Sequence, residues 1–596
     1  MERFLNLKYL LFNNLLSRWL HLLPFTGVLI TFLSITAGAN ELKEQEYNKA
    51  DSIAFSKNYM VSAANPYAVR AGLEILKQGG TAADAAVAIQ LVLNLVEPQS
   101  SGIGGGAFLL YYDGLNRELV TYDGRETAPE KTTQKLFINK NGVPLKFINA
   151  VVGGRAVGTP GTLALLETIH KHHGKVEWKD LFESSIRLSE GGFTVSKRLH
   201  DYLRGNYGNY LRTFKTARNF YFPGGQPIKN GDLLKNLSFA KTLKLLSKEG
   251  VKVFYEGSVA DGIENTVKNS AVNPGLLSKS DLKKYRVIKR PPICHYYRKH
   301  KICGMGPPSS GAIAIGQILG MLENFNLSEL GPKNTYSWHY ISEASKLAFA
   351  DRNKYVADPD FVKVPTQELL NSHYLKTRAK LISSKRSIFT PAPAGNPKPK
   401  ISRIYSSDPG ESRSGTSHIS IIDQYGNAIS MTTTIEGPFG SQLMTNGFLL
   451  NNELTDFSFA PSRDGRLIAN RVEPLKRPRS SMSPTMVFDN DDNLKLVIGS
   501  PGGARIIGYV VKTLIAVIDW NLDIQSAINL GHVVNRNGNT EIEFSTDAMK
   551  FANRLESLGH KIKIRKLNSG LHGILVTNDT ITGGADPRRE GVAQGN

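Results

Sequence analysis

A proline-rich, polar segment divides this chain of 596 residues and limits the folds that it can adopt. Residues 387–415 carry prolines at four positions between 391 and 399, which predicts no regular helix or strand as far as Pro409. Alternating strand-like residues begin directly afterwards, at Thr416. The sequence therefore predicts a linker, followed by a second part of the fold that begins at Thr416.

The rest of the chain combines helical and strand-like patterns, which is typical of a layered α/β protein. Apolar residues at helical spacing, with Thr81 as an N-cap, predict helices at 66–78, 81–95, 158–171, 237–249 and 336–354. Alternation and turn residues predict strands at 108–112, 118–122, 419–422, 428–434 and 496–498.

The two strands that follow the linker predict a β-hairpin with a candidate reactive site at its open end. If the turn is centred on Tyr425, antiparallel pairing places Thr416 opposite Thr434. A bulge at Gly426 would shift this register by one residue. We therefore expect two threonine hydroxyl groups to lie side by side.

Thr416 follows Gly415, and cleavage of the bond between them would change the chemistry of the threonine. A threonine inside a chain is a poor nucleophile, but a free α-amine on the same residue can act as its general base. The unperturbed pKa of such an amine is about 7.7–8.0. A Gly-Thr pair alone is weak support, because most such pairs are ordinary strand starts.

A glycine-rich turn, GSPGG at 499–503, follows the strand at 496–498 and precedes a helical pattern from Ala504. The N–H groups of Gly502 and Gly503 could face a developing oxyanion. A plain strand-to-helix turn explains the same residues. The spacing differs from the G-x-S-x-G elbow, which argues against a serine hydrolase.

Ten motifs in order along the chain resemble the γ-glutamyltransferase family. They are EP (97–98), SGIGGG (101–106), RETAP (125–129), PPSSG (307–311), TSH (416–418), GS (440–441), LLNN (449–452), RPRSSMSPT (477–485), GSPGG (499–503) and DPR (586–588). The likeness covers nearly all of the chain after the first 40 residues.

The resemblance implies a four-layer αββα fold of the N-terminal-nucleophile (Ntn) hydrolase type. It implies that the chain cuts itself between Gly415 and Thr416, and that a large fragment (40–415) and a small one (416–596) form the fold jointly. It also implies these roles: Thr416 as nucleophile, Thr434 as its hydroxyl partner, Gly502 and Gly503 as oxyanion hole, Arg125, Ser480 and Ser481 for an α-carboxylate, and Glu453 and Asp456 for an α-ammonium.

The implied reaction is γ-glutamyl transfer from glutathione or related γ-glutamyl compounds to water or amino acids, through an ester on Thr416. No metal or organic cofactor is implied. One alternative is an acylase for glutaryl amides such as cephalosporin side chains, which lack the ammonium that Glu436, Glu453 and Asp456 would hold. Another is an exported binding protein of the same fold that has lost catalysis.

Two departures from the family pattern carry expectations. Glu436 stands where the family commonly has Asn, and strand alternation places it on the Thr434 side. Its charge could strengthen ammonium binding or raise the pKa of the Thr416 amine. The segment 457–476 is shorter than a full lid and contains no Tyr or Trp, which predicts a more open pocket.

The formal net charge of +21 is unevenly distributed. From Thr416 onward there are 18 Lys+Arg and 18 Asp+Glu, so the whole excess precedes Thr416. No nucleic-acid-binding motif accompanies this charge, so we expect no nucleic-acid partner and no stable membrane association.

The first 39 residues predict export. An apolar run at 22–35 follows Lys8 and Arg18, and Ala37-Gly38-Ala39 offers a cleavage site, which is typical of a signal peptide and of a periplasmic or secreted protein. An uncleaved anchor is the alternative. The only two cysteines, Cys294 and Cys303, predict either a hairpin disulfide or two buried thiols.

Overall fold

A computed structural model describes residues 53–410, 415–577 and 580–596. The predicted signal peptide at 1–39 lies outside the described residues. Residues 48–596 belong to one compact unit, and its architecture is described here. Within the described part of the chain, no helix combines the length and apolarity that crossing a membrane requires.

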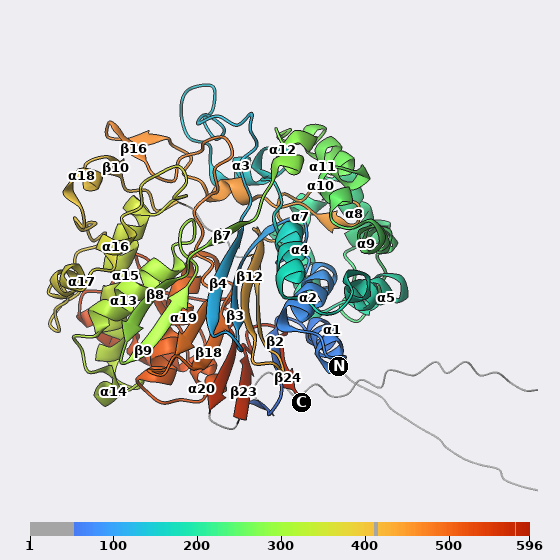
Figure 1. The fold of residues 1–596 in the computed structure, drawn as a ribbon. Coiled ribbons are helices and arrows are strands. Elements are labelled where there is room, and N and C mark those ends of the chain that lie inside the picture. The colour runs from blue at the N-terminus through green and yellow to red at the C-terminus, as the bar shows by residue number, and fades with distance from the viewer. Residues whose placement is uncertain (1–52, 411–414, 578–579) are drawn as a thin grey trace, which may run out of the picture. The chain divides into compact units, whose positions relative to one another are not determined.

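Two seven-stranded sheets form the centre of this unit (Figure 1). The first has the order β24 (Val592–Gly595), β2 (Met60–Ala63), β11 (Gly415–Ile422), β12 (Ala428–Glu436), β3 (Gly106–Asp113), β4 (Glu118–Gly124), β7 (Ile288–Arg290). The second has the order β1 (Ala54–Ser56), β23 (Thr580–Ala585), β22 (His572–Thr577), β18 (Leu494–Gly499), β17 (Thr485–Phe488), β9 (His300–Gly304), β8 (Ile293–Tyr297). Both sheets contain strands from before and after Thr416.

Helices cover the outer face of each sheet, which completes four αββα layers (Figure 1). The first sheet is covered by α1 (Pro66–Lys77), α2 (Ala82–Val96) and α4 (Thr162–His173). Outside them, α5 (Glu183–Gly191) packs on α2, and α9 (Leu237–Glu249) packs on α5. The second is covered by α13 (Gly311–Leu322), α19 (Ile506–Ile518) and α20 (Ile524–Asn529), and α15 (Thr335–Tyr355) packs on α13. The predicted fold class is confirmed.

Shorter elements connect and extend these layers. The helices are α3 (Phe147–Val151), α6 (Lys197–Arg204), α7 (Asn206–Leu211), α8 (Lys215–Tyr221), α10 (Lys252–Tyr255), α11 (Ser258–Lys268), α12 (Lys279–Lys284), α14 (Leu327–Leu330), α16 (Thr366–Leu369), α17 (Ser372–Ala379), α18 (Pro399–Ser402) and α21 (Ala552–Ser557). The strands are β5 (Phe193–Thr194), β6 (Leu233–Leu234), β10 (Tyr405–Ser406), β13 (Met444–Thr445), β14 (Phe448–Leu449), β15 (Ser462–Arg463), β16 (Arg466–Ile468), β19 (Val533–Asn535), β20 (Thr540–Glu543) and β21 (Ile562–Arg565).

Alternation along β11 explains how one strand serves two layers. Ile419 and Ile421 pack in the core between the first sheet and its helices. Ser420 faces the second sheet instead, because its Oγ donates to the carbonyl oxygen of His572 at 3.0 Å. Thr416 has the same parity as Ser420, so its side chain lies on the side that faces the other sheet.

The predicted hairpin register is confirmed. Thr416 pairs with Thr434, and the pairing continues without a shift to Ile422 and Ala428. Gly426 takes the positive φ of 79° in the turn without displacing the register. The one irregularity in this strand pair lies between Gly415 and Thr416.

Most predicted helices and strands are confirmed, with two differences. Helix α4 begins at Thr162 rather than at 158, because Pro160 lies just before its N-cap Gly161. The prediction that 387–409 contains no regular element was wrong. Pro399 occupies the first turn of α18, where a proline N–H is not needed, and β10 pairs with β16.

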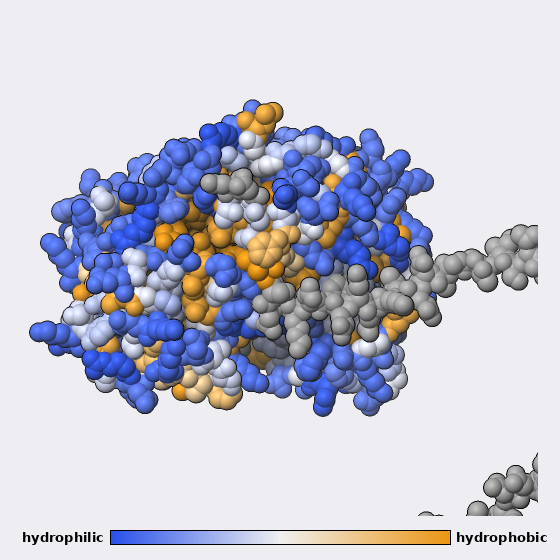
Figure 2. Space-filling view, turned by 90° about the horizontal axis from the view of Figure 1, so that it is seen from below, coloured by the Kyte–Doolittle hydropathy of each residue, from blue (hydrophilic) through white to orange (hydrophobic). Residues whose placement is uncertain are grey.

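Cys294 and Cys303 form a disulfide across the hairpin of β8 and β9, which decides between the two alternatives. Figure 2 views the molecule from below relative to Figure 1. On that face hydrophobic side chains gather toward the centre and hydrophilic ones surround them.

Candidate active site

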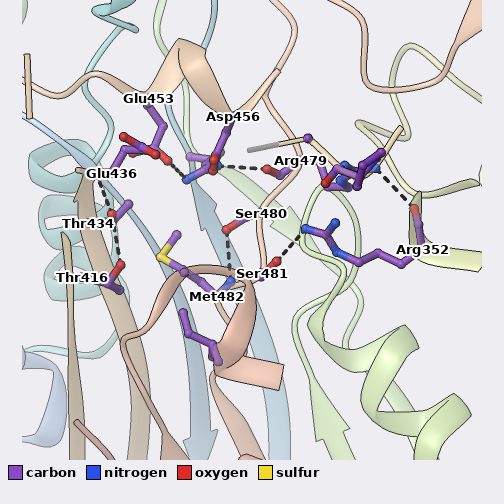
Figure 3. A pocket seen from close by; sticks show the side chains of 15 residues that line it. Arg352, Thr416, Thr434, Glu436, Glu453, Asp456, Arg479, Ser480, Ser481 and Met482 are labelled. Atoms are coloured by element: carbon purple, nitrogen blue, oxygen red, sulfur yellow. Dashed lines mark hydrogen bonds and ion pairs between the residues drawn. The ribbon is translucent and has the colours of Figure 1, made fainter. Parts of the chain in front are cut away.

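Thr416 lies at the start of β11 and lines a pocket together with Thr434 (Figure 3). Nine of the residues that line this pocket are predicted from the sequence. They are Thr416, Thr434, Gly503, Arg125, Glu436, Glu453, Asp456, Ser480 and Ser481. Gly502 directly precedes Gly503 in the sequence but does not itself line the pocket.

The hydroxyl of Thr434 connects Thr416 with the peptide bond that precedes it. Thr434 Oγ1 donates to the carbonyl oxygen of Gly415 at 2.8 Å and accepts from the N–H of Glu436 at 2.8 Å. It also lies 3.4 Å from Thr416 Oγ1. Because its single proton is used on Gly415, Thr434 Oγ1 can only accept the proton of Thr416.

The glycine turn after β18 brings a backbone with positive φ to the pocket. Gly502 has φ 138° and Gly503 has φ 62°, so both positions favour glycine. A Cβ on Gly502 would lie 2.5 Å from the ring of Tyr509. The short helix that starts at Gly503 leaves N–H groups without helical partners, which suits an oxyanion.

Acidic side chains surround Arg125 at one end of the pocket. Arg125 Nη2 lies 2.5 Å from Asp456, Nη1 contacts Glu453, and Glu126 lies 3.9 Å from Nη1. Burial raises the pKa of Glu126 to about 7 and that of Glu453 well above its usual range. The positive charge of Arg125 opposes both upward pKa shifts, and the charge of Asp456 contributes to them. We call Glu436, Glu453 and Asp456 the acidic end.

Glu436 lies in this pocket, as strand alternation predicts. It is buried at the end of β12 with φ 73°, a conformation that costs energy for a residue with a side chain. Its carboxylate accepts a hydrogen bond from the amide of Asn452. The contact with Asn452 therefore holds the Glu436 side chain in the pocket, two residues along the chain from Thr434.

Three arginines at the site are not predicted from the sequence. Arg352 and Arg479 line the pocket beside Ser480 and Ser481. Arg589 Nη1 donates to the carbonyl oxygen of Thr416 at 2.8 Å, and burial lowers the pKa of this guanidinium to about 10. Arg352 and Arg589 lie far along the chain from the predicted site residues, so no local pattern marks them. Arg479 lies within the motif at 477–485, but the motif alone assigns it no role.

The segment 457–476 lies beside the residues that precede the predicted cleavage site. Its strands β15 and β16 form a small sheet with β10, and Arg463 Nη1 donates to the carbonyl oxygen of Ser407 at 2.8 Å. Phe459 packs on Phe137, with ring centroids 4.4 Å apart. None of this segment's residues lines the pocket.

His339, Glu343 and His560 form a buried cluster elsewhere in the fold. His339 Nδ1 lies 2.8 Å from His560 Nε2, and Lys346 Nζ lies 2.8 Å from Glu343. Because an ammonium already neutralises the carboxylate and the imidazoles bond to each other, we assign this cluster a structural role. It joins α15 to the chain near His560.

The four-layer fold and the Thr416 pocket define the protein as an N-terminal-nucleophile hydrolase. The profile of the γ-glutamyltranspeptidase family matches residues 68–596. The chain belongs to this family.

Known relatives agree over most of the chain. The glutathione hydrolase proenzyme of Bacillus subtilis (strain 168) is 36% identical over 92% of this chain and 94% of its own length. That of Escherichia coli (strain K12) is 35% identical over 89% and 91%. The crystal structure of cephalosporin acylase from Bacillus halodurans matches with a TM-score of 0.81 and 25% identity, over 93% of this chain and 99% of that one.

Proposed function

We propose that the chain cuts itself between Gly415 and Thr416 and then acts as a γ-glutamyltransferase and glutathione hydrolase. The observation that carries this proposal is the position of Thr434 Oγ1 between the Gly415 carbonyl and the Thr416 hydroxyl. The relatives named as glutathione hydrolase proenzymes support the same activity.

The cut follows from this geometry. Thr416 Oγ1 attacks the carbonyl carbon of Gly415 while its proton passes toward Thr434 Oγ1, and the hydrogen bond from Thr434 stabilises the charge on the carbonyl oxygen. The C–N bond breaks, the nitrogen takes the proton that left Thr416 Oγ1, and an ester joins the carbonyl carbon of Gly415 to Thr416 Oγ1. Water hydrolyses this ester, which leaves a carboxylate on Gly415 and a free amine on Thr416.

The mature enzyme would use the new amine as its general base. Thr416 attacks the γ-amide of glutathione, Gly502 and Gly503 stabilise the oxyanion, and the amine gives its proton to the departing cysteinyl-glycine. Water or an amino acid then resolves the γ-glutamyl ester. These steps use only groups of the chain and its substrates.

The substrate's glutamyl head would lie across the pocket. Its ammonium fits the acidic end, where the carboxyl oxygens of Glu436, Glu453 and Asp456 can accept its hydrogen bonds. Its carboxylate fits Ser480 and Ser481 with the remaining capacity of Arg125. We therefore favour a γ-glutamyl donor over a glutaryl one.

Two measurements test this proposal. Sequencing the N-terminus of the smaller fragment should give Thr-Ser-His from Thr416, and Thr416→Ala should stay uncut. The rate on γ-glutamyl anilide should exceed the rate on glutaryl anilide. A faster glutaryl reaction would identify an acylase, and an uncut, inactive wild-type chain would identify a binding protein.

We also propose that residues 1–39 act as a cleavable signal peptide, which would place the enzyme in the periplasm or outside the cell. The apolar run at 22–35 and the small residues at 37–39 support this. Mass spectrometry of the large fragment should find a new N-terminus at Asn40. A large fragment that still begins at Met1 would favour the uncleaved anchor.

A further inference from the structure

A second cavity, of about 300 Å³, lies beside the loop that follows β12. Residues of α3, of α7 and of the loop 437–442 form its walls, and we call it the α3–α7 cavity. Its volume is at the lower end of the range in which proteins bind small molecules, about 300–1,000 Å³. The cavity can therefore hold one side chain of a ligand.

The lining of the α3–α7 cavity differs in chemistry from that of the Thr416 pocket. Phe147, Val151 and Pro438 contribute apolar surface, and Tyr207 and Tyr210 contribute aromatic rings. None of the described residues that line this cavity carries a charge, whereas arginine and acidic side chains line the Thr416 pocket. Such a lining suits an aromatic or branched apolar group and disfavours a carboxylate or an ammonium.

Consecutive residues of one loop border the pocket and the cavity. Glu436 lines the Thr416 pocket, and the next residue, Gly437, lines the α3–α7 cavity. Gly415 lies against the same loop, because a Cβ added to it would lie 2.6 Å from the carbonyl carbon of Gly437. The proposed cut separates Gly415 from Thr416. Withdrawal of Gly415 would then open a path from Thr416 to the cavity.

The loop between the two spaces has an unusual backbone. Glu436, Phe439 and Gln442 have positive φ values of 73°, 63° and 70°, which cost energy for residues with side chains. Gln442 Nε2 holds the loop by donating to the carbonyl oxygens of Pro438 and Gly440, at 2.9 and 3.1 Å. Because strained backbone of this kind is concentrated at sites that contact ligands, the loop supports a binding role for the cavity.

We propose that the α3–α7 cavity receives the side chain of the acceptor amine, and that it favours amino acids with an aromatic or branched apolar side chain. The inference rests on the proposed γ-glutamyl transfer and deepens it. The γ-glutamyl head fills the Thr416 pocket during this step, so the acceptor's side chain must lie outside that pocket.

The transfer step places the acceptor beside Thr416. The neutral amine of the acceptor attacks the carbonyl carbon of the γ-glutamyl ester, and the bond from that carbon to Thr416 Oγ1 breaks. One proton of the attacking amine passes through the Thr416 amine to Oγ1, and a γ-glutamyl amide is released. Burial of the acceptor's side chain in the cavity would hold its amine in place for this attack.

A competition between two acceptors tests this, because both react with the same ester on Thr416. The mature protein receives glutathione with equal concentrations of L-phenylalanine and L-alanine, and mass spectrometry quantifies the two γ-glutamyl dipeptides at early times. L-Alanine has the same reacting groups but only a methyl side chain. The phenylalanine product should exceed the alanine product at least about tenfold, which is about 1.4 kcal/mol.

Ile148→Asp places a carboxylate in the lining of the cavity, at a position that is 43% exposed. The ratio of the two products should fall at least about fivefold, because a phenyl ring would then lie against a hydrated charge. Ile564→Asp is the matched control, since Ile564 is 45% exposed on β21 and lines neither space. If Ile148→Asp does not fold, Tyr210→Ser removes a ring from the α7 wall and should give the same pattern.

Three results would overturn the inference. They are equal amounts of the two dipeptides in the wild type, a product ratio that Ile148→Asp leaves unchanged, and an equal fall of that ratio in Ile564→Asp. A wild-type protein that releases glutamate but forms neither dipeptide would also contradict it. Failure of the proposed function has a different signature, namely a wild-type protein that releases no glutamate from glutathione.

Discussion

Replacing Thr434 with valine isolates the hydrogen bond on which self-cleavage depends. Valine keeps the branched shape of threonine but removes Oγ1, so the Gly415 carbonyl loses its 2.8 Å donor and Thr416 loses its acceptor. Packing around β12 should change little because the two side chains have nearly the same volume. We expect precursor cleavage to slow strongly while the fold is kept.

The magnitude follows from the hydrogen bonds that this substitution removes. Removing one donor from a developing oxyanion slows a reaction about 10²–10³-fold, or about 2.7–4 kcal/mol. Thr434 Oγ1 also accepts from the N–H of Glu436, which would be left buried and unsatisfied. That change should lower the free energy of unfolding by about 1–3 kcal/mol.

The assay is a time course of freshly purified precursor on a denaturing gel. Thr433→Val is the matched control, because Thr433 precedes Thr434 on β12 and points to the opposite face. Its hydroxyl makes no hydrogen bond in the described part of the structure. Equal cleavage rates for Thr434→Val and the control would refute the proposed role of the hydroxyl.

Three further changes have defined outcomes. Glu436→Asn should move the pH–rate midpoint of the mature enzyme down by up to about one pH unit, because a nearby negative charge raises the pKa of the Thr416 amine. If the pH–rate profile and the substrate preference both stay unaltered, Glu436 has no part in the mechanism. The pKa of Glu126 is about 7, so its negative charge is lost as pH falls below that value and the donor's ammonium binds less well. KM for γ-glutamyl anilide should therefore rise as the pH falls from about one unit above that pKa to about one unit below it, and Glu126→Gln should flatten that rise. If Glu126→Gln leaves the pH dependence of KM unchanged, another group causes that dependence. The Gly502→Ala precursor should cleave itself slowly, and the mature variant should have low activity. The new Cβ would lie 2.5 Å from the Tyr509 ring, and residue 502 has φ 138°, which disfavours alanine. Normal activity of this variant would exclude the turn from the oxyanion hole.

The sequence predicted the parts of the site that depend on local geometry. Alternation and a turn centred on Tyr425 were sufficient to place Thr416 opposite Thr434, because strand pairing in a hairpin depends on residues close in the chain. The glycine turn was also recognisable, since Gly502 and Gly503 adopt conformations that other residues avoid.

Arg352 and Arg589 could not be predicted in the same way. Arg352 lies near the end of α15, where a basic residue is ordinary because it complements the helix dipole. Only the packing of α15 against the chain at Ser481 turns it toward the pocket. Arg589 is similar, because its contact with Thr416 spans 173 residues.

The order of strands in the first sheet also limits when the reaction can begin. β2 lies between β11 and β24, and β24 ends at Gly595, next to the last residue of the chain. Arg589, which holds the Thr416 carbonyl, lies just before that strand. The chain must therefore have emerged from the ribosome as far as Gly595 before this strand arrangement can close, so a nascent chain that stops short of β24 should remain intact.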